Sequence, residues 1–323
     1  MRVGVTGGAG YIGSHTVLAL LEAGHEVVIV DNFSTGDRIN LQPSALLIEG
    51  DFKNPEIMQK FLSQNLDAVF HFAALKAAGE SMEKPEAYSA ANVRGTLFLV
   101  ESLSAAGVKN LVFSSSAAVY GAPRYLPVDE KHPLEPINYY GYTKLCIEQN
   151  LNWFSRLGKI RFASLRYFNA AGYHRAGKIR GLEKNTANLL PLVMEAAAGL
   201  RPELLVLGND YQTRDGTGIR DYVHVEDLAD AHVRALQYIS NENRDITVNL
   251  GSETGISVME MINTAKRISG RNVPYRIVGR REGDPPELIA SSGLAHQLLD
   301  WQARHSDAET IIQSMWNLYK EAI

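Results

Sequence analysis

The segment VTGGAGYIGSH, residues 5–15, contains Gly7, Gly10 and Gly13 at a spacing of three residues. Gly8 also fits a G-x-G-x-x-G spacing with Gly10 and Gly13, so the sequence leaves two alignments of the motif open. A glycine turn before a helix exposes backbone N–H groups at the positive end of the helix dipole. Such a turn suits a pyrophosphate.

The residues around this turn have the pattern of a dinucleotide site. An apolar strand is expected at residues 3–6 and a helix at 11–23. A second strand, residues 26–30, ends at Asp31, about 20 residues past the loop, where a carboxylate accepts hydrogen bonds from an adenosine ribose. Because Asp31 would repel a 2′-phosphate, NAD is favoured over NADP. The alternative role for Asp31 is to cap the turn that follows it.

Length and composition limit the classes of protein. The chain of 323 residues is long enough for a large core, and its net charge of −4 gives no electrostatic attraction to nucleic acid or to an anionic membrane. A single cysteine, Cys146, allows no intrachain disulfide and no cysteine metal site. No apolar run reaches membrane-spanning length, and no targeting segment is visible before the first strand. We therefore expect a cytoplasmic location and no metal.

Strands and helices alternate through the first half of the chain. Further strands are expected at residues 46–49, 68–72, 110–114 and 161–166, with helices at 54–63, 84–106 and 138–156. This alternation predicts an α/β fold with a doubly wound parallel-sheet Rossmann domain over residues 1–168. Over residues 169–323 we expect a smaller α/β substrate-binding lobe, some late strands of which return to the main sheet. Its expected elements are a strand at 204–207 and helices at 187–200, 225–240, 257–270 and 306–321.

Tyr140 and Lys144 lie four residues apart in a helical pattern and so share one helix face. The preceding strand ends near Ser116, whose hydroxyl can converge with the tyrosine on one substrate hydroxyl. A phenol is a poor base at its ordinary pKa of about 10, but a nearby ammonium and a positive nicotinamide ring would lower that pKa. The alternative is structural: Tyr140 packs on the sheet, Lys144 extends to water and Ser116 caps a turn.

The glycine loop, the stretch SSSAAVYG at residues 114–121 and the Tyr140-x-x-x-Lys144 pair resemble the extended short-chain dehydrogenases/reductases. More narrowly, they resemble the UDP-glucose 4-epimerase family. Further matching stretches are HFAALK (71–76), NVRGT (92–96), RYFN (166–169), GNDY (208–211), DGTGIRDYVHV (215–225) and RREGD (280–284).

This resemblance implies a reaction and its partners. It implies an NAD-dependent 4-epimerase that interconverts UDP-glucose and UDP-galactose through a transient 4-keto sugar, with Tyr140 as the base. NAD would stay tightly bound and be regenerated at each turnover. The resemblance also implies a homodimer, built from the helices at 84–106 and 138–156.

The resemblance further implies the roles of single residues. Those expected to bind the cofactor are Gly7, Gly10, Tyr11, Ile12 and Gly13 in the loop, Asp31 and Asn32 at the adenosine ribose, Asp51 and Phe52 at the adenine, Phe72, Ala73, Ala74, Lys76 and Asn92 along the phosphates and nicotinamide, and Tyr140, Lys144 and Phe168. Those expected to bind the substrate are Lys76, Ser116, Tyr140 and Asn169, then Asn188 and Leu189 at a phosphate, Arg220 and Arg281 at the UDP diphosphate, Asp284 at the uridine ribose, and Leu288.

Leu288 bears on the choice of sugar. In the family, a tyrosine at this position goes with plain hexoses, and a small residue admits an N-acetyl group. Leucine is neither, and the following residues 289–292 depart from the family's usual Ala-Asp. We expect plain hexoses to be preferred, with UDP-N-acetylhexosamines, UDP-pentoses or UDP-glucuronate as alternative substrates.

Two other functions are weighed against this one. A 4,6-dehydratase would need an Asp-Glu pair after the serine, where this chain has Ala117 and Ala118. A non-catalytic NAD-sensing protein commonly lacks the tyrosine–lysine pair, which this chain retains.

Overall fold

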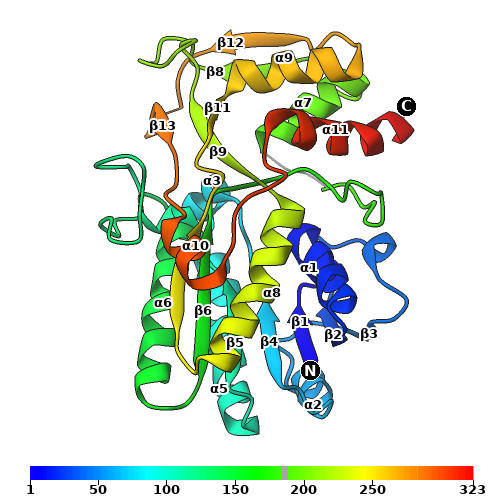
Figure 1. Ribbon diagram of the computed structural model, residues 1–323, viewed down its shortest axis with the longest axis vertical. Coiled ribbons are helices and arrows are strands. Elements are labelled where there is room, and N and C mark those ends of the chain that lie inside the picture. Colours follow the sequence, from blue (N-terminus) through cyan, green and yellow to red (C-terminus); the bar gives the residue numbers. More distant parts are fainter. Residues whose placement is uncertain (184–187, 282, 323) are drawn as a thin grey trace.

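The computed structural model describes residues 1–183, 188–281 and 283–322, and its centre is a seven-stranded parallel sheet (Figure 1). The strand order is β10-β6-β5-β4-β1-β2-β3. The strands are β1 (Arg2–Thr6), β2 (Glu26–Asp31), β3 (Leu46–Glu49), β4 (Ala68–His71), β5 (Asn110–Ser114), β6 (Arg161–Tyr167) and β10 (Ile246–Leu250). The order reverses direction after β1, so the predicted doubly wound sheet is confirmed.

Alternate residues of each strand face two different cores. Val27 and Ile29 of β2 pack into one apolar cluster with α1 (Tyr11–Glu22) and α8 (Val225–Asn241), while Val28 and Val30 pack into another on the opposite face. The helices of that second face are α2 (Pro55–Leu62), α5 (Gly95–Ala106) and α6 (Tyr139–Arg156). Because both faces are covered, the strands are apolar at consecutive positions, as expected for a buried parallel sheet.

A second group of elements forms the upper part of Figure 1. Strands β7 (Asn169–Ala171), β9 (Ile219–His224), β11 (Gly255–Ser257) and β13 (Glu287–Leu288) make a mixed sheet, and β8 (Leu204–Leu207) pairs with β12 (Tyr275–Val278). Helices α7 (Leu189–Ala198), α9 (Val258–Ser269) and α11 (Ala308–Tyr319) enclose a separate apolar core. The helix expected at 187–200 corresponds to α7, and Ala187, its expected first residue, lies outside the described residues.

Two late segments return to the main sheet. β10 pairs with β6, and α8 packs on the sheet face that α1 covers. A further helix, α10 (Gly293–Leu299), contributes Ala295 and Leu299 to the same core. The main sheet therefore contains segments from both sides of residue 168. The division of the chain at this residue into a cofactor domain and a substrate lobe stays a prediction.

The helix expected at residues 84–106 has three parts. They are α4 (Pro85–Tyr88), a π-helical turn η2 (Ser89–Arg94) and α5. The π-helical turn contains Asn92, whose amide accepts from Leu75 N at 2.9 Å and donates to Leu75 O at 2.9 Å and to Thr143 Oγ1 at 3.2 Å. The remaining short elements are α3 (Ala78–Glu83) and the 3-10 turns η1 (Arg38–Asn40), η3 (Ala117–Val119) and η4 (Lys320–Ala322).

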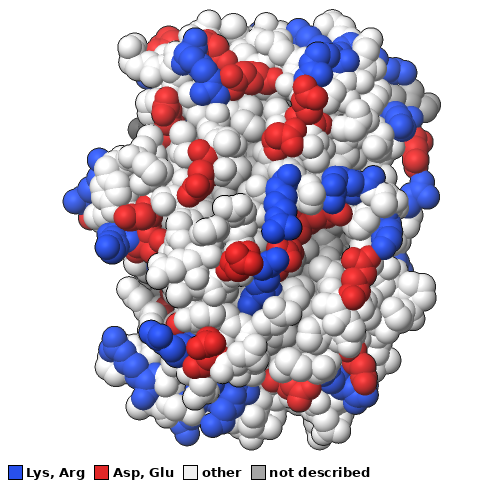
Figure 2. All heavy atoms as spheres, in the orientation of Figure 1, with Lys and Arg blue, Asp and Glu red and all other residues white. Residues whose placement is uncertain are grey.

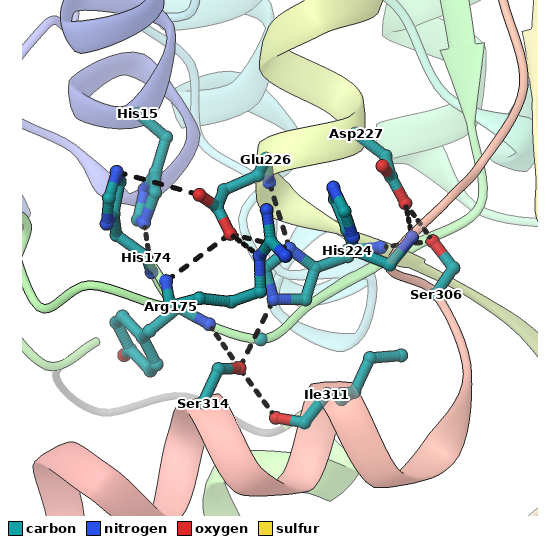
Figure 3. A network of polar contacts seen from close by, with 12 residues as sticks. His15, His174, Arg175, His224, Glu226, Asp227, Ser306, Ile311 and Ser314 are labelled. Atoms are coloured by element: carbon teal, nitrogen blue, oxygen red, sulfur yellow. Dashed lines mark hydrogen bonds and ion pairs between the residues drawn. The ribbon is translucent and has the colours of Figure 1, made fainter.

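A histidine-rich polar network joins the two parts of the chain between α1, α8 and α11 (Figure 3). His15 Nε2 accepts from the backbone of His174 at 3.1 Å, and His15 Nδ1 lies 2.8 Å from Tyr11 O. His224 Nδ1 accepts from Glu226 N at 3.2 Å and so caps α8. An imidazole nitrogen that accepts a hydrogen bond carries no proton, so these contacts require neutral rings.

This network predicts a loss of stability in acid. Burial lowers the pKa of His15 to about 4 and that of His224 to about 3. Because an unfolded histidine titrates near pH 6.5, its unfolded form binds the proton first, and stability is lost as pH falls from about 6.5 towards 4. We expect His15→Gln to reduce the fall in Tm between about pH 7 and pH 4.5, whereas His296→Gln, at an exposed position, leaves that fall unchanged. An equal fall in His15→Gln and the parent protein would contradict this role.

Candidate active site

The glycine loop is shaped by close backbone contacts. Gly7 has a φ of +75°, and a Cβ at Gly13 would lie 2.1 Å from the Gly7 carbonyl oxygen. Gly10 is the N-cap residue of α1, so it has no side chain to compete for the first helix amides. A Cβ at Gly8 would instead meet the side chain of Ile29. The geometry therefore favours the alignment Gly7-Gly10-Gly13, with Gly8 packed on the sheet.

A cavity of about 250 Å³ opens over the carboxyl ends of β1, β2, β4 and β5. It is lined by all the predicted cofactor residues except Asn92 and Phe168. The lining residues that the sequence did not single out are Val30, Ser34, Thr35, Gly50, Lys53, Leu75, Ala91, Ser114 and Tyr167. Most of these are chain neighbours of predicted residues. Asn92 is not part of the lining, but its side-chain amide hydrogen-bonds both the N–H and the carbonyl of Leu75, which is.

Asp31 lies at the end of β2 and lines this cavity. Its Oδ2 accepts from Ala9 N at 2.9 Å and its Oδ1 from Phe33 N at 2.8 Å, so it ties the glycine loop to the next turn. Asp31 can therefore cap this turn and also accept from an adenosine ribose, because each carboxylate oxygen can accept a second hydrogen bond. The glycine loop and the Asp31 carboxylate line the same cavity, an arrangement that suits the predicted dinucleotide.

Tyr140, Lys144 and Ser116 come together at the end of β5. Lys144 Nζ donates to Ser114 O at 2.7 Å and lies 5.7 Å from the centre of the Tyr140 ring. The Ser116 hydroxyl lies close enough to the Tyr140 phenol to act against the rise in its pKa, and the Ser116 oxygen accepts from Ala118 N at 3.1 Å. Tyr140 and Lys144 line the cavity, whereas Ser116 lies just outside its lining.

Burial dominates the proton affinities of this group. It raises the pKa of Tyr140 to about 12, against the effect of Ser116, and it lowers the pKa of Lys144 to about 7, against the charge of Glu148. The lowering of the tyrosine pKa that we predicted is therefore not produced by the chain alone. A positive charge bound in the cavity would lower the pKa of Tyr140, as predicted.

Of the predicted substrate residues, Lys76 and Tyr140 line this cavity, and the others are not part of its lining. Several of these others, together with the predicted cofactor residue Phe168, fall into two groups. Phe168 and Leu288 pack against the apolar cluster of Ala117, Val119, Tyr120 and Val128, directly after Ser116. The second group surrounds β9, where Arg220 Nη2 donates to Asp284 Oδ1 at 2.6 Å and Asp284 N donates to Arg281 O at 3.2 Å. Leu288 is opposite Arg220 in the β13–β9 pairing and so connects the two groups.

Four predicted residues lie apart from these groups. Asn169 Nδ2 donates to Asp221 O at 2.8 Å, and Lys76 forms an ion pair with Glu183. Asn188 is the N-cap residue of α7, and Leu189 is its first residue. Their assignment to one substrate comes from the sequence resemblance.

The surface carries mixed charge. Figure 2 shows basic and acidic side chains interspersed over the viewed face, an arrangement that gives no single-sign field on that face. Within residues 1–183, 188–281 and 283–322, no three His, Cys, Asp or Glu residues are grouped so that they could hold a metal ion. No helix in these same ranges is long and apolar enough to cross a membrane.

Comparison with known proteins places the chain in a family. Residues 3–251 match the model of the NAD dependent epimerase/dehydratase family. The chain is 41% identical to the UDP-glucose 4-epimerase of Lacticaseibacillus casei, over 99% of this chain and 97% of that protein. It superposes with a TM-score of 0.95 on the Brucella ovis UDP-glucose 4-epimerase in complex with NAD, at 40% identity, covering 99% of this chain and 98% of that one.

A second solved structure is equally similar. The Stenotrophomonas maltophila UDP-glucose 4-epimerase, with bound NAD and formylated UDP-arabinopyranose, has a TM-score of 0.95 and 42% identity, and the alignment covers 100% of this chain and 98% of that one. Full-length similarity at this identity confirms the resemblance drawn from the glycine loop and the Tyr140–Lys144 pair. The chain belongs to the NAD dependent epimerase/dehydratase family.

Proposed function

We propose that the protein is an NAD-dependent UDP-glucose 4-epimerase that interconverts UDP-glucose and UDP-galactose. The observation that carries this proposal is that Tyr140 and Lys144, with Ser116 beside them, line the same cavity as the glycine loop and Asp31. The chain is also similar over its whole length to enzymes of that name. In this proposal, residues 1–168 supply most of the cofactor site and residues 169–323 most of the UDP-sugar site.

When bound, NAD supplies a hydride acceptor and a positive charge that favours the tyrosine phenolate. Gly7, Gly10 and Gly13 leave the backbone amides of α1 open to the pyrophosphate, and Asp31 is placed to accept from the ribose. Tyr140 takes the proton of the sugar 4-hydroxyl and later returns it, while Ser116 hydrogen-bonds the same oxygen. Because the transient 4-keto sugar must turn over, the sugar is held loosely and the UDP is held firmly.

We assign the tight binding of UDP to the residues around β9, which are Arg220, Arg281 and Asp284. Arg220 and Arg281 present guanidinium groups, which match phosphate oxygens through forked hydrogen bonds. In the chain alone Arg220 donates to Asp284, so we infer that UDP binding exchanges this contact for one to phosphate and leaves Asp284 for the uridine ribose. Asn188 and Leu189, at the start of α7, are assigned to the same phosphates.

Leu288 is the residue we assign to sugar choice. It packs against the apolar cluster that follows Ser116, so its side chain takes up space at the sugar end of the site. We expect Leu288→Ser to raise the ratio of turnover on UDP-N-acetylglucosamine to turnover on UDP-glucose by about tenfold, the scale set by a few methylene groups in a pocket. Leu145→Ser, on the same cluster, is the matched control. An unchanged ratio in Leu288→Ser would remove this residue from sugar selection.

We further propose that two copies associate through the helices at residues 84–106 (α4, η2 and α5) and 138–156 (α6). In the single chain, α6 exposes Trp153 and Tyr142, which are 61% and 50% accessible. Large exposed aromatic side chains are typical of interfaces between protein chains.

The direct test is turnover on a panel of UDP-sugars by purified protein without added NAD. We expect conversion of UDP-galactose and UDP-glucose, with weaker conversion of the N-acetylated pair. Conversion only when NAD is added would contradict the retained cofactor. Preference for UDP-pentoses, UDP-glucuronate or acetylated sugars would support an epimerase of another UDP-sugar, and no conversion at all would support an NAD-sensing protein.

A further inference from the structure

The serine turn at the end of β5 faces three successive turns of α6. Tyr140, Lys144 and Glu148 follow one another at intervals of four residues and so share one helix face. Lys144 Nζ donates to Ser114 O at 2.7 Å and Ser115 Oγ donates to Glu148 Oε1 at 2.5 Å. Ser116 lies close enough to the Tyr140 phenol to influence its pKa. Glu148, one helical turn after Lys144, thus adds a third contact between α6 and the serine turn.

Arg166 of β6 holds the carboxylate of Glu148. Its Nε lies 2.9 Å from Oε1 and its Nη2 lies 2.5 Å from Oε2, which is a bidentate pair. Nη1 donates to Tyr120 OH at 2.9 Å, and that hydroxyl donates to Asn249 Oδ1 at 2.7 Å. The pair is therefore anchored through β6 to β10, at the edge of the sheet.

Stability alone gives no reason for such a pair. Glu148 and Arg166 are 3% and 5% exposed, and a well-packed apolar pair of the same volume is often as stable as a buried ion pair or more so. What an apolar pair cannot do is accept the hydrogen bond of Ser115, which is fully buried. The pair thus fixes the position of a turn whose neighbouring residues touch Tyr140 and Lys144.

We propose that Glu148, clamped by Arg166, is a positioning residue for the epimerase reaction: it holds the Ser114–Ser116 turn against α6 so that Ser116 and Lys144 meet Tyr140 in one geometry. This proposal rests on the proposed function. It adds a residue that does not line the cavity and that touches the reacting groups only through Ser115 and the helix.

Glu148 also acts on Lys144 by its charge. The carboxylate lies one helical turn from the ammonium and opposes the effect of burial on the lysine pKa, which lies near 7. The other groups close to Lys144 are the Ser114 carbonyl, the aromatic rings of Phe113 and Tyr140, and His71 of β4, which burial keeps neutral. Without the carboxylate, Lys144 loses its proton at lower pH, and the alkaline limb of the activity profile moves down.

Two variants separate position from charge. Glu148→Gln retains an acceptor for Ser115 and removes the charge, so we expect kcat to fall about tenfold and the alkaline limb of kcat to move down by about one pH unit, with KM little changed. Ser115→Ala removes the contact and leaves the ion pair intact. It should lower kcat by a similar factor without moving the limb, and it leaves no buried charge unpaired, so it tests positioning even where Glu148→Gln does not fold.

Asp227→Asn is the matched control, because Asp227 is a buried, hydrogen-bonded carboxylate on α8, the helix on the opposite face of the sheet. It should lower Tm and leave the pH profile in place. Parental kcat in both test variants, or a profile in Glu148→Gln that matches that of Asp227→Asn, would overturn the proposal. Absence of activity in the parent protein would instead overturn the proposed function, so the two failures are distinguishable.

Discussion

Tyr140→Phe is expected to lower kcat for UDP-galactose by a factor of about 10²–10⁴, the usual contribution of a positioned general acid or base. The substitution removes one hydroxyl and retains the ring near which Lys144 lies. We therefore expect bound NAD and Tm to stay close to those of the parent protein. The measurement is the rate of UDP-glucose formation, with the NAD content of each preparation determined in parallel.

Tyr142→Phe is the control for this experiment, because Tyr142 lies on the same helix with its side chain half exposed. It should retain the parental rate. If Tyr140→Phe also retained that rate, the phenol would not be the base. Lys144, whose pKa burial lowers to about 7, would then be the group to test next.

Gly13→Ala is expected to abolish cofactor retention. A Cβ at this position would lie 2.1 Å from the carbonyl oxygen of Gly7, a backbone atom that cannot rotate away. Either α1 or the loop must move, and both shape the end of the cavity assigned to the pyrophosphate. We expect a loss of roughly 3 kcal/mol or more in the free energy of unfolding, and protein that purifies without NAD and has no activity until NAD is added.

The measurements for this variant are the ratio of absorbance at about 260 nm to that at 280 nm and thermal unfolding followed by circular dichroism. Gly79→Ala is the matched control, since a Cβ there meets nothing within 4 Å and its φ is not positive. Retention of NAD by Gly13→Ala at the parental level would mean that this loop does not hold the pyrophosphate.

The main sheet could be predicted from local sequence because its strands are short apolar runs separated by helical periodicity. Six of its seven strands lie within one residue of the expected ranges, and of these β3 and β5 match fully. The place of β10 could not be predicted in this way, because Ile246–Leu250 pairs with β6 across about 80 residues of chain that carry elements of both sheets. The turn η2 was also missed, since its sequence continues a helical pattern through Asn92.

The candidate site shows the same limit. The glycine loop, Asp31 and the Tyr140–Lys144 pair have spacings that follow from local structure, and the structure places them around one cavity. The Glu148–Arg166 pair has no such signal, because a charged residue on a helix is usually solvent-exposed and its partner lies on a buried strand. Only the packing of α6 on β6 shows that these two charges meet.

The most direct test of the account uses UDP-galactose labelled with deuterium at C4 of the sugar, incubated with purified protein and no added NAD. The account predicts UDP-glucose that retains the deuterium at C4, formed over many turnovers for each NAD bound, because the hydride leaves and returns within one closed site. UDP-glucose that has lost the label, or formation of no more than one UDP-glucose for each NAD, would contradict it.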